Sequence, residues 1–329
     1  MIRVLPIEAA TYERSELHGP ERIWQETNCY VDLWIEALHA AGLDPIAALA
    51  FTLSADFDGD QWRFIKYPLD DLRRVYGLQV SEMNPWRGME HHIAEQLEMG
   101  RWLTIEVDSW YLPDTAGTAY QHEHAKTSIV PNMIDQEGRR LGYFHGAGYY
   151  ELTDEDFDGL LHRNGTPAGY LPPYIELVKL DEVVRLADDE LLDAARSLVA
   201  KHLALRPTSN PVHRMAERFP TDAEWLTSAG MDGFHLYSFA TLRQCGCTAE
   251  LAASLCGWLA DRGEPTSESR DKFAELAAAS KSVQFKLARL AAGRDVDVAS
   301  LIDNMSTLWD EAMGPLADLY LRAGADSCT

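Results

Sequence analysis

The 329-residue chain is 46% hydrophobic and 25% charged, which is the composition of a globular protein and excludes a fibrous or extensively disordered one. Its formal net charge of −23 at pH 7 argues against nucleic acid or an anionic membrane as the main partner, and no apolar run approaches the roughly 18 residues of a membrane span. The N-terminus lacks the apolar core of a signal peptide, and the five cysteines do not suggest a disulfide framework, so we expect a cytoplasmic protein.

The first half of the chain alternates between helical and extended patterns. A polar lead-in over 1–22 precedes a mostly buried helix that starts at Cys29 and stops before Gly42. Further elements are predicted in this order: strands at 47–53 and 61–67, a helix at 69–76, a strand at 78–83, a helix at 90–99, a strand at 102–107, paired strands at 125–134 and 140–150, and a helix that opens at Thr153. Together they predict an α+β domain over residues 1–165.

Residues 165–175 are rich in proline and glycine, and we place a domain boundary there. Beyond it the apolar periodicity is helical throughout. The predicted helices span 180–205, 222–245, 248–262, 267–292 and 296–322. Residues 166–329 are therefore predicted to form an all-α helical bundle.

Cys29 is the first candidate for chemistry, because it stands where a polar loop enters the first helix. Backbone N–H groups and the helix dipole at such a position favour the thiolate, which is the reactive form of cysteine. Asn28 or Thr27 would cap this helix, and the amide of Gln25 or Asn28 could face an oxyanion beside the sulfur. The alternative is that Cys29 is a small residue of the core.

A nucleophilic cysteine needs a base, and usually a third group that orients the base. Three histidines near the 125–134 strand are candidates for the base, and polar residues around them are candidates for its orientation. The histidines are His122, His124 and His145, and the residues that could orient the base are His145, Asp108, Asn132 and Asp135. A zinc site that joins these histidines to His91 and His92 is the alternative, but no zinc motif or glycine-rich phosphate loop is present, so we predict no metal and no bound cofactor.

The layout of these residues is similar to that of papain-like folds of the bacteriocin-leader peptidase type. The closer resemblance is to the acyltransferase group of butirosin biosynthesis, and among its relatives to an uncharacterised DUF1839-like branch. Three segments carry it: Asp108–Pro113, the stretch from His124 to Asp135, and Tyr149–Leu152. The resemblance covers about residues 20–162 and implies a papain-like N-terminal domain followed by a helical one.

The resemblance also implies an activity, which is acyl transfer in natural-product biosynthesis. An aminoacyl or similar small acyl group would pass from the phosphopantetheine thioester of a carrier protein to Cys29, and then to an amine. The relatives accompany aminoacyl-carrier-protein ligases, which points to an aminoacyl donor. We expect His124 to be the base, with His122 as the alternative. The relatives carry a histidine directly before the apolar run, where this chain has Thr127 and Ser128, so the absence of a competent base is a third alternative.

The remaining assignments concern substrate and partner. We expect substrate contacts from Asp108, Tyr111, His122 and Asn132, with His145 in the catalytic set. Two other functions stay open: a cysteine peptidase or amidase on the same scaffold, and a non-catalytic module that binds a carrier protein.

Residues 270–294 offer a docking surface for an acidic carrier protein. This stretch has a net charge of +4 in an otherwise acidic chain, and Lys281, Lys286 and Arg289 lie in its helix. Charge complementarity of this kind steers the encounter between two proteins more than it sets their affinity. The alternative is an ordinary solvated helix face.

Overall fold

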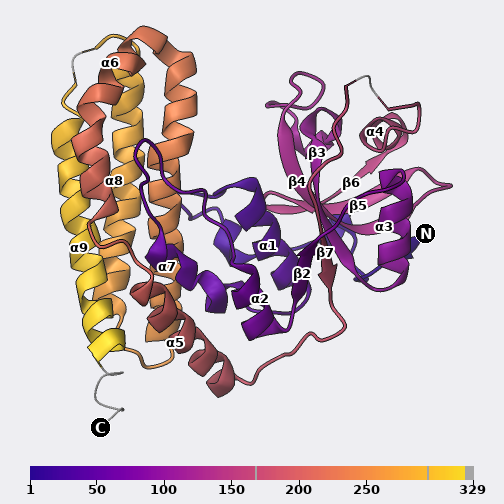
Figure 1. Cartoon of the computed structure of the whole chain (residues 1–329), viewed down its shortest axis with the longest axis horizontal. Coiled ribbons are helices and arrows are strands. Elements are labelled where there is room, and N and C mark those ends of the chain that lie inside the picture. The colour runs from indigo at the N-terminus through magenta and orange to yellow at the C-terminus, as the bar shows by residue number, and fades with distance from the viewer. Residues whose placement is uncertain (167–168, 295, 323–329) are drawn as a thin grey trace. The chain divides into compact units, whose positions relative to one another are not determined.

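The computed structural model describes residues 1–166, 169–294 and 296–322, so Cys328 and part of the predicted 165–175 linker lie outside the described residues. The chain forms two compact units (Figure 1). The first consists of Met1–Gly19, Asn28–Pro45 and Leu69–Arg185, and the second of Pro20–Thr27, Ile46–Pro68 and Leu186–Thr329. The boundary that we placed at 165/166 thus moves to Arg185, because the chain after the linker first adds a strand to the sheet of the first unit.

The first unit is built on a seven-stranded antiparallel sheet with the order β2-β7-β3-β4-β5-β6, in which β1 pairs with β4. The strands are β1 (Ile2–Arg3), β2 (Gln79–Glu82), β3 (Trp102–Asp108), β4 (Lys126–Asp135), β5 (Arg140–His145), β6 (Gly148–Thr153) and β7 (Ile175–Lys179). A turn joins β4 to β5, and in it the Asp135 carboxylate accepts a hydrogen bond from the Gly138 N–H at 3.1 Å.

Helices cover both faces of this sheet (Figure 1). They are α1 (Cys29–Ala40), α2 (Leu69–Tyr76), α3 (Met89–Glu98) and α4 (Asp154–Leu160). Tyr30 of α1 donates a hydrogen bond to Glu176 at 2.6 Å, and Thr104 donates to the same carboxylate oxygen at 2.7 Å, so α1 lies on the face that bears Thr104 and Glu176. Side chains alternate along a strand, so the neighbouring Ile105 points to the opposite face, where it lines a cavity together with Ile93 of α3.

Several predicted strands differ from the structure. The apolar run 47–53 belongs to a 3₁₀ helix, Pro45–Ser54, since an unbroken apolar run has no period that separates strand from buried helix. Residues 61–67 contribute only an isolated bridge between Phe57 and Trp62. The predicted strand 140–150 is two strands, β5 and β6, separated by a turn at Gly146, whose φ of +47° suits glycine.

The second unit is helical, as predicted. Its helices are α5 (Asp188–Ala204), α6 (Pro211–Ser238), α7 (Gln244–Ala260), α8 (Ser267–Ala291) and α9 (Ala299–Arg322), with a π-helical turn at Phe239–Arg243. Helix α6 begins eleven residues before the predicted position, because Asn210 caps it and Pro211 occupies its first turn. Helix α8 packs between α7 and α9 and buries Phe273, Leu276 and Leu287. Among the described helices, none is long and apolar enough to cross a membrane.

Candidate functional site

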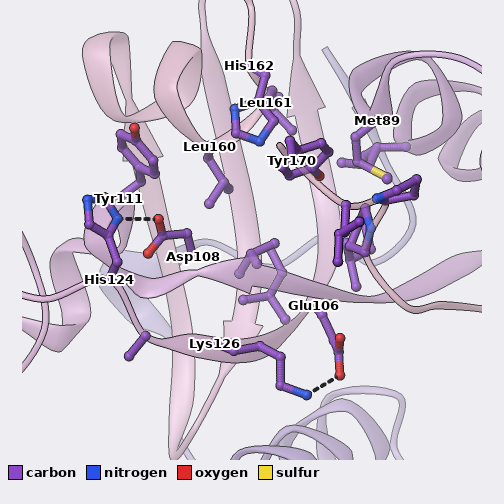
Figure 2. Close-up of a pocket in the computed structure, with 18 residues that line it drawn as sticks. Met89, Glu106, Asp108, Tyr111, His124, Lys126, Leu160, Leu161, His162 and Tyr170 are labelled. Carbon is purple, nitrogen blue, oxygen red and sulfur yellow. Dashed lines mark hydrogen bonds and ion pairs between the residues drawn. The ribbon is translucent and has the colours of Figure 1, made fainter. Parts of the chain in front are cut away.

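The first unit contains an apolar cavity of about 630 Å³ on the face of the sheet opposite α1. Strands β3 and β4 form its floor, and α3, the end of α4 and residues 170–173 form its walls (Figure 2). Its apolar lining comprises Met89, Ile93, Ile105, Val107, Ala125, Ile129, Leu160, Leu161, Leu171, Pro172 and Pro173. The volume lies within the range of roughly 300–1,000 Å³ that is usual for small-molecule sites.

An imidazole–carboxylate pair lies at one end of this cavity. His124 Nδ1 donates a hydrogen bond to Asp108 at 2.6 Å, and the ring stacks on Trp110 with centroids 4.5 Å apart and planes 12° apart (Figure 2). The two contacts fix the orientation of the ring. Within the described part of the chain, His124 Nε2 has no protein hydrogen-bond partner. An imidazole that donates from Nδ1 presents Nε2 as an acceptor, which is the arrangement of a general base.

Strand pairing explains why these two residues meet. Asp108 ends β3 and His124 stands two residues before β4, and the antiparallel register places Asp108 opposite Lys126. The Ser109 N–H donates to the Ala125 carbonyl at 2.9 Å and closes the base of the intervening loop. The second Asp108 oxygen accepts from the Trp110 N–H at 3.0 Å, so one carboxylate holds both ends of loop 109–125.

Tyr111, which was predicted to contact substrate, forms part of the cavity wall beside this pair. Its ring packs on α4, where the absence of a side chain at Gly159 leaves room for it. A Cβ atom at Gly159 would lie 2.1 Å from Tyr111 Cε1. The close approach of backbone and ring fixes the position of Tyr111.

We expect Gly159→Ala to displace Tyr111 and to lower the free energy of unfolding by about 1–3 kcal/mol, the usual cost of overpacking. Denaturant unfolding measures this change, with Gly88→Ala as the matched control, because the nearest atom to a Cβ at Gly88 is 3.7 Å away. Equal stability of the two variants would contradict this account of the Tyr111 contact.

A second imidazole, His162, lines the same cavity from the end of α4. Burial lowers its pKa below the ordinary 6.5, although the charge of Asp108 acts in the opposite direction. The ring packs edge-on against the Tyr170 ring, with the two ring centroids 4.5 Å apart. His162 also has φ of +53°, a backbone conformation that L-residues rarely adopt and that occurs more often at functional sites. This neutral side chain was not among the residues predicted from the sequence.

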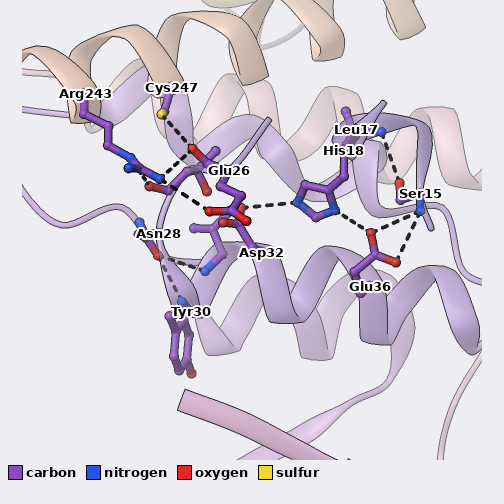
Figure 3. A network of polar contacts seen from close by, with 12 residues as sticks. Ser15, Leu17, His18, Glu26, Asn28, Tyr30, Asp32, Glu36, Arg243 and Cys247 are labelled. Carbon is purple, nitrogen blue, oxygen red and sulfur yellow. Dashed lines mark hydrogen bonds and ion pairs between the residues drawn. The ribbon is translucent and has the colours of Figure 1, made fainter. Parts of the chain in front are cut away.

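Cys29 is the first residue of α1, as predicted, and it is half-buried. Asn28 caps the helix, with its side-chain oxygen accepting from the N–H groups of Tyr30 at 3.1 Å and Val31 at 2.9 Å. The Asn28 oxygen is therefore engaged by the helix, as Figure 3 shows. The other described cysteines, Cys245, Cys247 and Cys256, are buried. Cys29 is thus the most accessible thiol of the described residues.

Cys29 and the predicted base, His124, make no direct contact that the described residues record. Cys29 is absent from the lining of the cavity that holds His124, and no hydrogen bond links it to an imidazole in the described residues. By strand alternation, Glu106 and Asp108 follow Thr104 on the face of the sheet that α1 covers.

His145 also lies away from Cys29. The preceding residue, Phe144, contacts Tyr12, whose hydroxyl bonds Glu36 of α1, so His145 points to the opposite face. There His145 Nδ1 lies 2.5 Å from Asp114, and the Thr127 hydroxyl lies 2.8 Å from His145 Nε2. Asp114 belongs to loop 109–125, so this half-buried network fastens the loop to β5. His145 therefore helps to hold this loop against the sheet.

The other predicted site residues have separate environments. Asn132 is fully buried, accepts from the Leu5 N–H at 2.9 Å and donates to the Leu5 carbonyl at 3.0 Å, which makes it a structural link to the N-terminal segment. His122 is exposed on loop 109–125. Gln25 belongs to the second unit, where its amide donates to the Pro20 carbonyl at 3.3 Å.

A buried polar cluster on α1 was missed by sequence reasoning (Figure 3). His18 lies between two carboxylates: Nδ1 bonds Glu36, and Nε2 lies 3.3 Å from Asp32. All three side chains are at most 2% exposed. Burial opposes protonation of His18, but the hydrogen bonds and charges of Asp32 and Glu36 outweigh it and raise the pKa to about 9.

Helix α8 carries the predicted docking surface for a carrier protein, and some of its basic side chains already form ion pairs or ring contacts within the protein. Arg270 pairs with Asp271 at 2.8 Å, and Lys272 pairs with Glu311 of α9 at 3.0 Å. The Lys281 ammonium lies 4.2 Å from the centre of the Trp24 ring.

The described residues contain no group of three or more His, Cys, Asp or Glu side chains that could hold a metal ion.

The chain thus consists of a mixed α/β unit, which holds a cavity with an imidazole–carboxylate pair, and a helical unit. The chain belongs to the DUF1839 family: the model of the DUF1839 N-terminal domain matches residues 13–180, and that of the DUF1839 C-terminal domain matches residues 188–318. The search of curated proteins found no match. Membership of this family confirms the DUF1839-like part of the expected resemblance, while the likeness to butirosin acyltransferases stays a prediction.

Proposed function

We propose that this protein is an acyltransferase that moves an acyl group, in particular an aminoacyl group, from the phosphopantetheine thioester of a carrier protein to an amine. The observation that supports it best is the Asp108–His124 pair at the end of an apolar cavity, with Nε2 of the imidazole in position to accept a proton. The protein would need no cofactor of its own, since the carrier protein brings the phosphopantetheine.

In this proposal the transfer is direct. The acceptor nitrogen attacks the thioester carbonyl carbon while His124 Nε2 removes its proton, and a tetrahedral oxyanion forms. The C–S bond then breaks, the amide forms, and the carrier thiolate takes the proton from His124. Asp108 stabilises the imidazolium between the two steps, as carboxylates do in hydrolytic triads. Tyr111, in the wall of the same cavity, can donate its hydroxyl to the oxyanion.

A second route keeps the covalent chemistry that the sequence suggests. Cys29 stands at the N-terminus of α1, half-buried, while the other described cysteines are buried. A thiol at this position could carry the acyl group as a thioester. With α1 packed on an antiparallel sheet, this arrangement supports a papain-like origin of the first unit. In this route His124, oriented by Asp108 through Nδ1, or another group near the start of α1 would take the proton from the thiol.

One experiment tests the proposal and separates the routes. The purified protein is incubated with a panel of aminoacylated carrier proteins and primary amines, and products are identified by mass spectrometry. We expect an amide product that requires both protein and amine, and we expect Cys29→Ala to retain transfer. Loss of transfer in a folded Cys29→Ala variant, with an acyl adduct on Cys29 in the wild type, would favour the covalent route. Free acid as the main product, regardless of amine, would indicate a hydrolase and overturn the proposal.

A further inference from the structure

The cavity has two chemically different ends. Figure 2 shows His124, Asp108 and Tyr111 at one end and Met89 and Tyr170 at the other, with Leu160 between them. The Asp108–His124 pair is therefore at one end only, while the second imidazole, His162, packs against Tyr170. The rest of the wall away from the pair consists of aliphatic side chains of α3, β3 and β4 and of the end of α4.

The charged groups at the cavity edge are already paired. Lys126 bonds Glu106 at 2.6 Å, and His124 bonds Asp108 at 2.6 Å. The remaining imidazole, His162, has its pKa lowered by burial and is neutral at pH 7. A charged group on a bound molecule would thus lose its hydration without gaining an unpaired ion of opposite sign along the apolar wall.

From this division we infer that the cavity selects a large apolar acyl group, of the size of leucyl, phenylalanyl or hexanoyl, whose carbonyl lies beside His124 and whose chain runs past Leu160 towards α3. This inference rests on the proposed function, because it names the donor of that reaction. A glycyl or acetyl group would leave most of the 630 Å³ unfilled, and a group that ends in a carboxylate would meet Ile93 and Met89.

Ile93 offers the sharpest test of chain length. It is 1% exposed and lines the cavity from α3, one helical turn after Met89, which Figure 2 places at the end away from His124. Ile93→Trp should fill that end without touching the Asp108–His124 pair. Glu98→Trp is the matched control, since Glu98 is exposed on the same helix and does not line the cavity.

The experiment measures binding of unreactive probes by calorimetry. The probes are the amide analogues of acetyl-, butyryl-, hexanoyl- and octanoyl-N-acetylcysteamine, with a glutaryl analogue as the charged comparison. We expect affinity to rise about fourfold with each added methylene up to hexanoyl, which corresponds to the free energy of burying one methylene. The glutaryl probe should bind more weakly than the butyryl probe. Ile93→Trp should reduce binding of hexanoyl and octanoyl at least tenfold and leave acetyl unchanged, and Glu98→Trp should alter neither.

Equal affinity across the series, or tighter binding of the glutaryl probe, would overturn the inference. So would an Ile93→Trp variant that binds octanoyl like the wild type and yet unfolds at the wild-type temperature. Length-dependent binding without transfer of the matching thioesters to an amine would contradict the proposed function and leave the inference standing. Transfer that prefers acetyl or glycyl donors would contradict the inference and leave the proposed function standing.

Discussion

Replacement of His124 by alanine is expected to lower the rate of acyl transfer by about 10²–10⁴-fold, the usual contribution of a positioned general base. The fold should be unaffected, because the imidazole is 66% exposed and its pair with Asp108, itself 34% exposed, lies near the surface, where ion pairs contribute little to stability. Added imidazole should restore part of the rate in His124→Ala, because the open cavity can admit a free base. Steady-state rates with one aminoacyl carrier protein and one amine measure both effects.

Two further variants make the result specific. His122→Ala is the control from the same loop, and it should retain full activity, since His122 is exposed and does not line the cavity. Asp108→Asn should keep the cap on the Trp110 N–H but lose the acceptor for His124 Nδ1, so we expect a fall of roughly 10²-fold. A His124→Ala enzyme with wild-type rates would remove His124 from the reaction.

Much of the first unit could be predicted because its signals are local. Asn28 before an apolar helix marked the start of α1, and alternation with turn residues marked β4 and β5. Strand β7 was missed because it follows a proline-rich segment that signals a boundary, and only pairing with β2 and β3 places it in the sheet. That pairing is between residues far apart in the chain, which sequence periodicity does not report.

The candidate site, too, could be predicted from the sequence only in part. Asp108 and His124 were both selected from the sequence, but the expected partner of His124 was Cys29. Strand order supplies the missing information: Asp108 ends β3 and His124 lies two residues before β4, so pairing of these strands brings the two side chains together. For His18 a signal did exist, since Asp32 and Glu36 interrupt an otherwise apolar helix four residues apart and need a buried partner.

The His18 cluster predicts a strong dependence of stability on alkaline pH. The pKa of His18 is raised from 6.5 to about 9 in the folded protein, because the bonds and charges of Asp32 and Glu36 outweigh burial. A raised pKa stabilises the fold fully below the unfolded value, and the stabilisation is lost as pH rises through the folded value. Between pH 6.5 and 9 we therefore expect the free energy of unfolding to fall by roughly 3 kcal/mol from this group.

Two measurements check this prediction in complementary ways. NMR titration of the His18 ring should give a pKa near 9, while that of His162 should lie below 6.5, because burial without a bonded carboxylate acts in the opposite direction. Denaturant unfolding across this pH range should show the loss of stability, and Glu36→Gln should reduce its size by removing one of the two carboxylates. Glu98→Gln, at an exposed position of α3, should leave the pH dependence unchanged. If His18 titrates at or below 6.5, the two buried carboxylates do not stabilise an imidazolium, and the cluster must instead be held by a proton on Asp32 or Glu36.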